Sequence, residues 1–337
     1  MKERETGLDI VKALATFLVV CVHFYLSIGY YQTPIATPKM YVMTFVRWGC
    51  MAAVPLFLMS TGYFKAKKTI SKSHYISLIP ILAAYLVLCI IRMLVENVMY
   101  GKIHTFSSAI KSLLTYQSAW YVGMYIGLML ICPFINKAWN ACNKREHNIL
   151  IVSMVVITMM YPLINYVFPS YFQILYPITY YLIGVYIKTY QIKANKLLMI
   201  LGVVACTAIN SVITIVNSMG GIFNPGLIVA VDNGQNAITV AIEAVCLFIL
   251  FYDVKISNSF VSSLFKSASN CSLEIYLIQA AFNAVIYTYM GRIVNGAENW
   301  FWLFFVTAPI SFVLSWIAAE IYKKTIGNVV NIVIRKI

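Results

Sequence analysis

Apolar stretches long enough to cross a lipid bilayer recur along almost the whole chain. A helix that spans the hydrocarbon core needs about 20 predominantly apolar residues. The chain has 337 residues, of which 61% are hydrophobic and 11% are charged, whereas about a quarter of the residues in a soluble domain are charged. We therefore predict an all-α, polytopic transmembrane bundle, and we treat residues 1–337 as one membrane domain because no large soluble domain fits between the apolar stretches.

Ten spans are predicted from these stretches, and the fifth, sixth and eighth have the weakest sequence pattern. They cover residues 8–29, 40–63, 75–99, 118–136, 148–167, 171–188, 197–216, 235–252, 271–290 and 299–322. Only the segment VFPSYF separates the fifth span from the sixth, and Glu243 interrupts the eighth. The N-terminal segment has no small-residue cleavage site before the first apolar stretch, which indicates an uncleaved first span.

Basic residues cluster in the short segments between the apolar stretches. With the N-terminus placed inside, 18 of the 25 Lys and Arg residues lie in inside segments, 4 lie in outside segments and 3 lie within spans. This asymmetry follows the positive-inside rule, so both termini are predicted to be cytoplasmic. The net charge of +14 then reflects membrane topology, and we expect no nucleic-acid partner. The eight cysteines show no metal-ligand spacing, so we expect no metal either.

The first predicted span carries three polar residues, Asp9, Lys12 and His23. Charged groups inside spans are rare and usually face the bundle interior or a cavity. Eleven residues separate Lys12 from His23, which leaves them about 20° apart around the helix and about 16 Å apart along it. A polar path along this face explains both residues and makes His23 a functional candidate. Asp9 can pair with Lys12, and an ion pair at the membrane border is an alternative interpretation of Asp9.

The second predicted span ends close to a group of basic residues. Arg47 lies in its outer part, Pro55 is expected to kink or loosen the helix, and Ser60 belongs to a small, polar inner end. The segment KAKKTISKSH follows. Its basic side chains suit a polyphosphate ligand or, alternatively, anionic lipid of the inner leaflet; they are Lys65, Lys67, Lys68, Lys72 and His74.

Polar residues in later spans are open to structural interpretations. Arg92 and Glu96 are four residues apart and are expected to pair. The aromatic residues near Trp120 and Tyr121 also fit an interfacial belt. In the ninth span, Glu274 can reach the inner border and Gln279 needs a partner inside the bundle. The outside segment 217–234 is either a re-entrant or surface loop or a plain connector.

Several stretches of the sequence resemble motifs of one known family. LDIVKALATFLVVCVHF matches a first-span motif in which His follows a basic residue after ten positions, and VRWGCMAAVPLFLMSTGYF matches a second-span motif. SAWYVGMYIGLMLICPFI, YYLIGVYI and SLEIYLIQ match weaker motifs. On these residues the chain resembles the acyltransferase-3 family of integral membrane acyltransferases, which mostly O-acetylate bacterial surface glycans. Two positions depart from the family pattern: Thr61 interrupts a Ser-Gly pair, and Gln279 stands where His is common.

The resemblance implies an O-acyltransferase of the cell membrane. It would move an acetyl group from cytoplasmic acetyl-CoA to a hydroxyl of a cell-surface or lipid-linked saccharide. The candidate catalytic residues are His23, as general base or acyl carrier, and Lys12, near the donor's entry. The candidates for the CoA phosphates are Lys65, Lys67, Lys68 and Lys72, and those for substrate binding are Asp9, Arg47, Ser60, Trp120, Tyr121, Glu274 and Gln279.

Two other classes of function are compatible with parts of the sequence. A transporter or flippase is the main alternative, because ten spans with buried polar residues also suit transport; weak internal symmetry argues against it. A glycan polymerase or ligase typically has large loops outside the membrane, and the sequence between the predicted spans holds no loop of that size.

Overall fold

A computed structural model describes residues 5–101, 103–160, 170–220 and 234–334, and no β-strand occurs in these ranges. The elements of the first half are α1 (Thr6–Ser27), η1 (Tyr30–Gln32), α2 (Pro38–Gly49), α3 (Ala53–Lys65), α4 (Lys72–Ile76), α5 (Ile79–Tyr100), α6 (Phe106–Leu114), α7 (Trp120–Asn140) and α8 (Lys144–Met159). Those of the second half are η2 (Ser170–Leu175), α10 (Tyr176–Tyr190), α11 (Lys196–Ser218), α12 (Ile238–Phe251), α13 (Ser259–Asn270), α14 (Ser272–Met290), η4 (Ala297–Trp300), α15 (Phe304–Tyr322), η5 (Lys323–Gly327) and α16 (Asn328–Ile334).

A helix overlaps each of the ten predicted ranges, so the prediction of a helical membrane protein is confirmed. Six helical segments in the described part are long and apolar enough to cross a membrane, and α12 is a shorter apolar helix. The total of ten spans and the cytoplasmic placement of the termini stay predictions. The end of the fifth predicted span and most of segment 217–234 lie outside the described residues.

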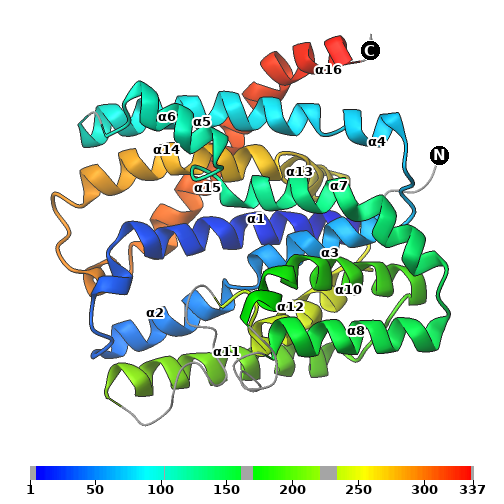
Figure 1. Cartoon of the computed structure of the whole chain (residues 1–337). Helices are drawn as coiled ribbons and strands as arrows, with labels where there is room; N and C mark the ends of the chain where they lie inside the picture. The colour runs from blue at the N-terminus through cyan, green and yellow to red at the C-terminus, as the bar shows by residue number, and fades with distance from the viewer. Residues whose placement is uncertain (1–4, 102, 161–169, 221–233, 335–337) are drawn as a thin grey trace.

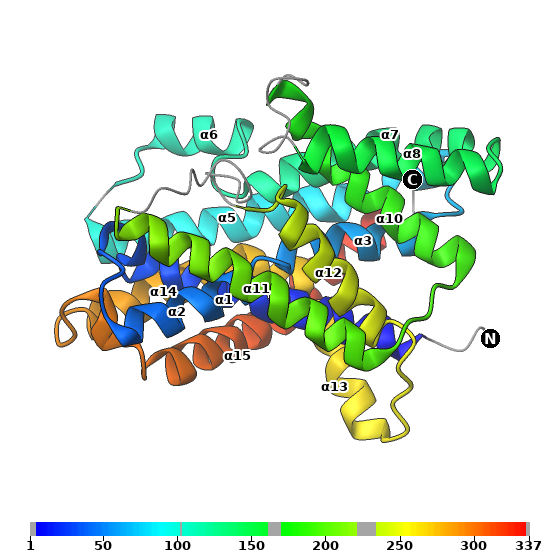
Figure 2. The ribbon, with the colours of Figure 1, turned by 90° about the horizontal axis from the view of Figure 1, so that it is seen from below.

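Helix α1 is the centre of the bundle. It contacts α2, α3, α12, α13, α14 and α15, and Figure 1 shows it running through the middle of the molecule with α5 and α14 on one side and α3 and α10 on the other. In the view from below, α11 and α12 cover α1 (Figure 2). A polar residue on α1 is therefore surrounded by protein rather than by lipid.

The second predicted span is divided into two helices. α2 ends at Gly49 and α3 begins at Ala53. Pro55 lies in the first turn of α3, where the missing N–H of a proline costs no intrahelical hydrogen bond. The interruption thus comes just before the proline that was expected to loosen the helix.

Two glycines allow α3 and α10 to pack at very short distance. A Cβ added to Gly62 would lie 1.9 Å from the carbonyl oxygen of Tyr181, and one added to Gly184 would lie 2.0 Å from that of Met59. Neither space can hold a methyl group, so each helix uses a glycine to admit the backbone of the other. This crossing fixes the C-terminal end of α10 against that of α3.

The start of α1 and α16 lie toward the same end of the bundle (Figure 1). The connectors from α3 to α4 and from α7 to α8 lie at this end as well. The first connector carries Lys67 and Lys68, and Lys137 and Lys144 lie in the helices on either side of the second. The fold therefore supports grouping these basic segments on one face.

Candidate active site

A cavity of about 1050 Å³ opens inside the bundle beside α1. Its α1 wall runs from Asp9 to Leu26, which are about 26 Å apart at about 1.5 Å per residue. The hydrocarbon core of a bilayer is about 30 Å thick. One continuous cavity thus extends along most of a membrane-spanning helix, and α3, α7 and α14 supply much of the remaining wall.

One end of the cavity is rich in lysine, and we refer to it as the lysine end. Lys12, Lys65, Lys67 and Lys188 line it. The Lys12 Nζ donates a hydrogen bond of 2.7 Å to the backbone oxygen of Ser269, which ties α1 to α13. These four cations come from three helices and the turn after α3, and three carboxylates, those of Glu5, Asp9 and Glu274, line the same cavity.

A side-chain amide fixes the turn that carries two of these lysines. Asn136 of α7 donates hydrogen bonds to the backbone oxygens of Lys65 (2.7 Å) and Lys68 (2.9 Å). Its own Oδ1 accepts a hydrogen bond of 2.8 Å from the Tyr181 hydroxyl. The basic segment is therefore held against α7 and α10 at its start, although its lysine side chains extend away from the backbone.

His23 lies farther along the same wall. Its ring is 6.2 Å from that of Tyr276 between centroids, and the Gln279 side chain donates a hydrogen bond of 3.3 Å to the backbone oxygen of Tyr276. An imidazole that lines a cavity is placed to exchange a proton with a bound molecule.

Aromatic rings line the cavity next to His23. The ring of Tyr276 packs edge-on against that of Tyr121 with centroids 5.8 Å apart, and Tyr121 contacts Trp120, Tyr125 and Phe57 with centroid distances of 6.2, 6.0 and 5.9 Å. All five rings line the cavity. Such a wall offers flat apolar faces with hydroxyl groups at their edges, which suits a partly polar ligand.

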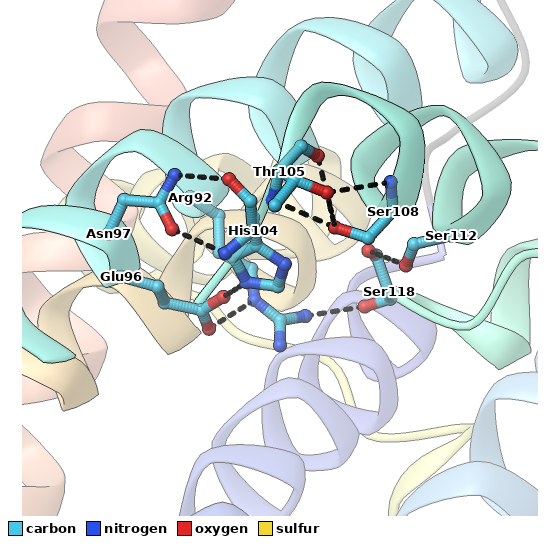
Figure 3. A network of polar contacts seen from close by, with 8 residues as sticks. All are labelled: Arg92, Glu96, Asn97, His104, Thr105, Ser108, Ser112 and Ser118. Atoms are coloured by element: carbon cyan, nitrogen blue, oxygen red, sulfur yellow. Dashed lines mark hydrogen bonds and ion pairs between the residues drawn. The ribbon is translucent and has the colours of Figure 1, made fainter. Parts of the chain in front are cut away.

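A polar network outside the cavity supports this aromatic wall (Figure 3). Arg92 pairs with Glu96 at 2.7 Å, as predicted, and also donates a hydrogen bond to the backbone oxygen of Ser118. His104 contacts the other oxygen of Glu96 at 2.8 Å. Because Ser118 lies two residues before the first residue of α7, the network holds the helix start from which Trp120 and Tyr121 project.

The end of the cavity away from the lysines is bordered by Tyr31 and Leu26. The Tyr31 hydroxyl accepts a hydrogen bond of 3.2 Å from Arg47 Nε. The Arg47 guanidinium also lies over the Trp48 ring, 4.3 Å from its centroid. Arg47 is therefore a buried support behind Tyr31 and is not part of the cavity lining.

Comparison with known protein families decides the class of this chain. A family model described as an acyltransferase domain matches residues 5–320. The chain belongs to the acyltransferase-3 family. The comparisons with curated proteins and with solved structures gave no match. Membership in the acyltransferase-3 family, together with the apolar helices, makes the chain a multi-pass membrane acyltransferase.

The structure places most of the predicted acyltransferase-3 site residues around one cavity. Those that line it are Asp9, Lys12, His23, Ser60, Lys65, Lys67, Trp120, Tyr121 and Glu274. Four others lie outside the lining: Arg47, Gln279, Lys68 and Lys72. Among the described residues, no group of three His, Cys, Asp or Glu side chains suits a metal ion. Whether these residues serve an acyl donor or acceptor stays a prediction.

The prediction that His74 joins the basic cluster is wrong. Its side chain is buried, and its Nε2 lies 2.8 Å from the backbone oxygen of Met129 in α7. Ser71 caps the short helix α4, and this turn directs His74 into the protein. The imidazole therefore joins α4 to α7 and does not face the lysine end.

Sequence reasoning missed several residues of the cavity. Lys188 was counted only as a topological lysine, and Tyr276, Tyr31 and Gln235 were not proposed as site residues, yet all four line the cavity. Lys188 reaches the lysine end because α10 packs on α3 through Gly62 and Gly184. In the sequence, a basic residue at the end of a weakly apolar stretch gives no indication that its side chain reaches the cavity.

Proposed function

We propose that this chain is an O-acyltransferase that transfers an acetyl group from acetyl-CoA to a hydroxyl of a saccharide. The observation that carries the proposal is one cavity with lysines at its mouth and His23 about 16 Å deeper along α1. Acetyl-CoA has a phosphorylated head, which the lysines could bind, and a thioester at the end of a long arm, which could reach His23.

The donor would enter from the lysine end with its thioester first and its phosphorylated head last. Its phosphates would lie near Lys12, Lys65 and Lys67, whose ammonium groups bind phosphate as point charges. The narrow pantetheine arm would follow α1 inward and present the thioester beside His23. In this arrangement the lysine end faces the cytoplasm, as the charge asymmetry predicts.

His23 would act on the proton of the acceptor. In the proposed step the acceptor hydroxyl gives its proton to the imidazole while its oxygen bonds to the thioester carbonyl carbon. The carbon–sulfur bond then breaks, and the imidazolium returns the proton to the CoA thiolate. In an alternative mechanism, the imidazole carries the acyl group briefly before the acceptor hydroxyl attacks it.

The acceptor would approach from the opposite end, past Tyr31 and Leu26. The rings of Tyr276, Tyr121 and Trp120 offer faces for the apolar side of a sugar ring, and their polar edges can bond its hydroxyls. A lipid-linked or exported glycan in the cell membrane fits an entrance at this end. The cavity then separates the charged donor from the acceptor along the membrane normal.

Transfer of label tests this proposal. Membranes that contain the protein are incubated with acetyl-CoA labelled in the acetyl group, and the glycan fraction is analysed for alkali-labile label. Wild-type membranes should label the glycan, and membranes with His23→Ala at an equal protein level should not. Equal labelling by the two membranes would reject the role of His23.

Transport is the second candidate function, because a cavity along most of α1 is also what a transporter requires. The same membranes distinguish the two: a transporter would move a saccharide or other small solute across sealed vesicles without forming an ester. Solute uptake with no label in glycan would favour transport over transfer.

A further inference from the structure

Lys188 joins the lysine end from the C-terminal turn of α10. Its Nζ lies 2.8 Å from the Glu5 carboxylate and 4.2 Å from the centroid of the Tyr63 ring. Lys188, Glu5 and Tyr63 all line the cavity. The Lys188 ammonium group at the lysine end therefore already binds an anion. This anion is the Glu5 carboxylate of the same chain.

The position of Lys188 is fixed by the crossing of α3 and α10. Gly184, one turn before Lys188, contacts the backbone of α3, and Gly62, just before Tyr63 and Lys65, contacts the backbone of α10. The spacing between the backbones of Lys188 and Lys65 therefore depends on two close backbone contacts. Two lysines anchored on these helices can direct their ammonium groups to a ligand with phosphate groups.

Glu5 is much less constrained than Lys188. Its side chain is 44% exposed, against 28% for Lys188. It precedes α1 and can turn into solvent at small cost, because an exposed ion pair of this kind contributes little free energy. A phosphate group carries more negative charge and more acceptor oxygens than a carboxylate, so it can replace Glu5 on Lys188.

We infer that Lys188 binds a phosphate group of the CoA donor and that Glu5 occupies its place when the donor is absent. This inference rests on the proposed function, since it names a further residue for the same donor. Glu5 then acts as a displaceable competitor: donor binding breaks the Glu5–Lys188 ion pair and transfers Lys188 to the phosphate. Anionic lipid has the same phosphate chemistry, and the experiment must separate the two sources.

The test measures dissociation constants of the purified full-length protein in nanodiscs. The ligands are acetyl-CoA and acetyl-pantetheine, which keeps the thioester but has no nucleotide phosphates. The variants are Lys188→Gln, Lys188→Arg and Glu5→Gln, with Lys193→Gln as the control, because Lys193 is exposed and follows α10. Each variant is measured in nanodiscs of phosphatidylcholine alone and with added phosphatidylglycerol.

Lys188→Gln should weaken acetyl-CoA about tenfold, as expected for loss of a charge-assisted hydrogen bond. It should leave the affinity for acetyl-pantetheine unchanged, and Lys188→Arg should retain most of the affinity for acetyl-CoA. Glu5→Gln should strengthen acetyl-CoA binding, and Lys193→Gln should have no effect. The differences should be the same in both lipid compositions.

Three results would overturn the inference. The first is an unchanged affinity of Lys188→Gln for acetyl-CoA. The second is that Lys188→Gln binds acetyl-pantetheine more weakly by the same factor as acetyl-CoA. The third is that Lys188→Gln has an effect only when phosphatidylglycerol is present. The last result would assign Lys188 to lipid. If the wild-type protein binds neither thioester, the proposed function fails first; if it binds both and Lys188→Gln binds them equally well, only this inference fails.

Discussion

Lys12 and His23 line one cavity from the same face of α1, about 16 Å apart along the helix axis. Lys12 lies at the charged mouth, and His23 lies among aromatic rings. The pair therefore divides the cavity into a part that can bind the charged head of a donor and a part where chemistry can occur.

Replacing Lys12 should weaken donor binding more than it slows chemistry. Lys12→Arg keeps a cation at the mouth and should keep most activity, whereas Lys12→Gln should raise the KM for acetyl-CoA by about tenfold through loss of a charged contact. Initial rates at several acetyl-CoA concentrations measure both parameters. A fall in kcat alone, with KM unchanged, would place Lys12 in the chemical step instead.

The aromatic wall should affect acceptor use. Tyr276 packs on Tyr121 and faces His23. Tyr276→Leu removes this ring and should raise the KM for a saccharide acceptor several-fold, because aromatic pairs contribute about 0.5–1.5 kcal/mol beyond their buried area. Tyr276→Phe retains the ring and should change the KM for the acceptor less. Equal effects of the two substitutions would indicate that the hydroxyl, rather than the ring, matters.

Arg92 should act as a positioning residue for the start of α7. Arg92→Gln breaks the ion pair with Glu96 and the hydrogen bond to Ser118, so we expect lower activity and a lower melting temperature. Lys111→Gln on the exposed surface of α6 is the matched control, and it should change neither. Full activity of Arg92→Gln would show that Trp120 and Tyr121 do not depend on this network.

Gly184→Ala should destabilise the protein by about 1–3 kcal/mol, the usual cost of overpacking. The added methyl group would meet the backbone oxygen of Met59 and push α10 away from α3. Gly127→Ala in α7 is the control, because a Cβ there meets no atom within 4 Å. Thermal unfolding in detergent compares the two. Equal melting temperatures for both variants would contradict the close crossing of α3 and α10.

Helical periodicity is a local property, and it was enough to predict that Lys12 and His23 share a face. The same holds for the pairing of Arg92 with Glu96, which are one turn apart. The contribution of Lys188 depends instead on how α10 crosses α3, and that of Tyr276 depends on how α14 packs on α1. Neither the crossing nor the packing leaves a pattern in a single stretch of sequence.

The basic segment after α3 shows a second limit. All of its polar residues look equivalent in a run such as KAKKTISKSH. The short helix α4 turns His74 inward to Met129, whereas Lys65 and Lys67 stay at the cavity. Which residues of a basic segment face a ligand depends on where its turns fall, and here Asn136 of α7 fixes the first of them.

The release of CoA by the purified protein tests the central claim most directly. Wild-type protein and His23→Gln are reconstituted at equal amounts, given acetyl-CoA and a saccharide acceptor, and assayed for free thiol. The proposed role of His23 predicts that His23→Gln releases CoA at least about 100-fold more slowly than wild type, as expected for loss of a general base, while it still binds acetyl-CoA. Equal rates of CoA release by the two proteins would contradict a catalytic role for His23.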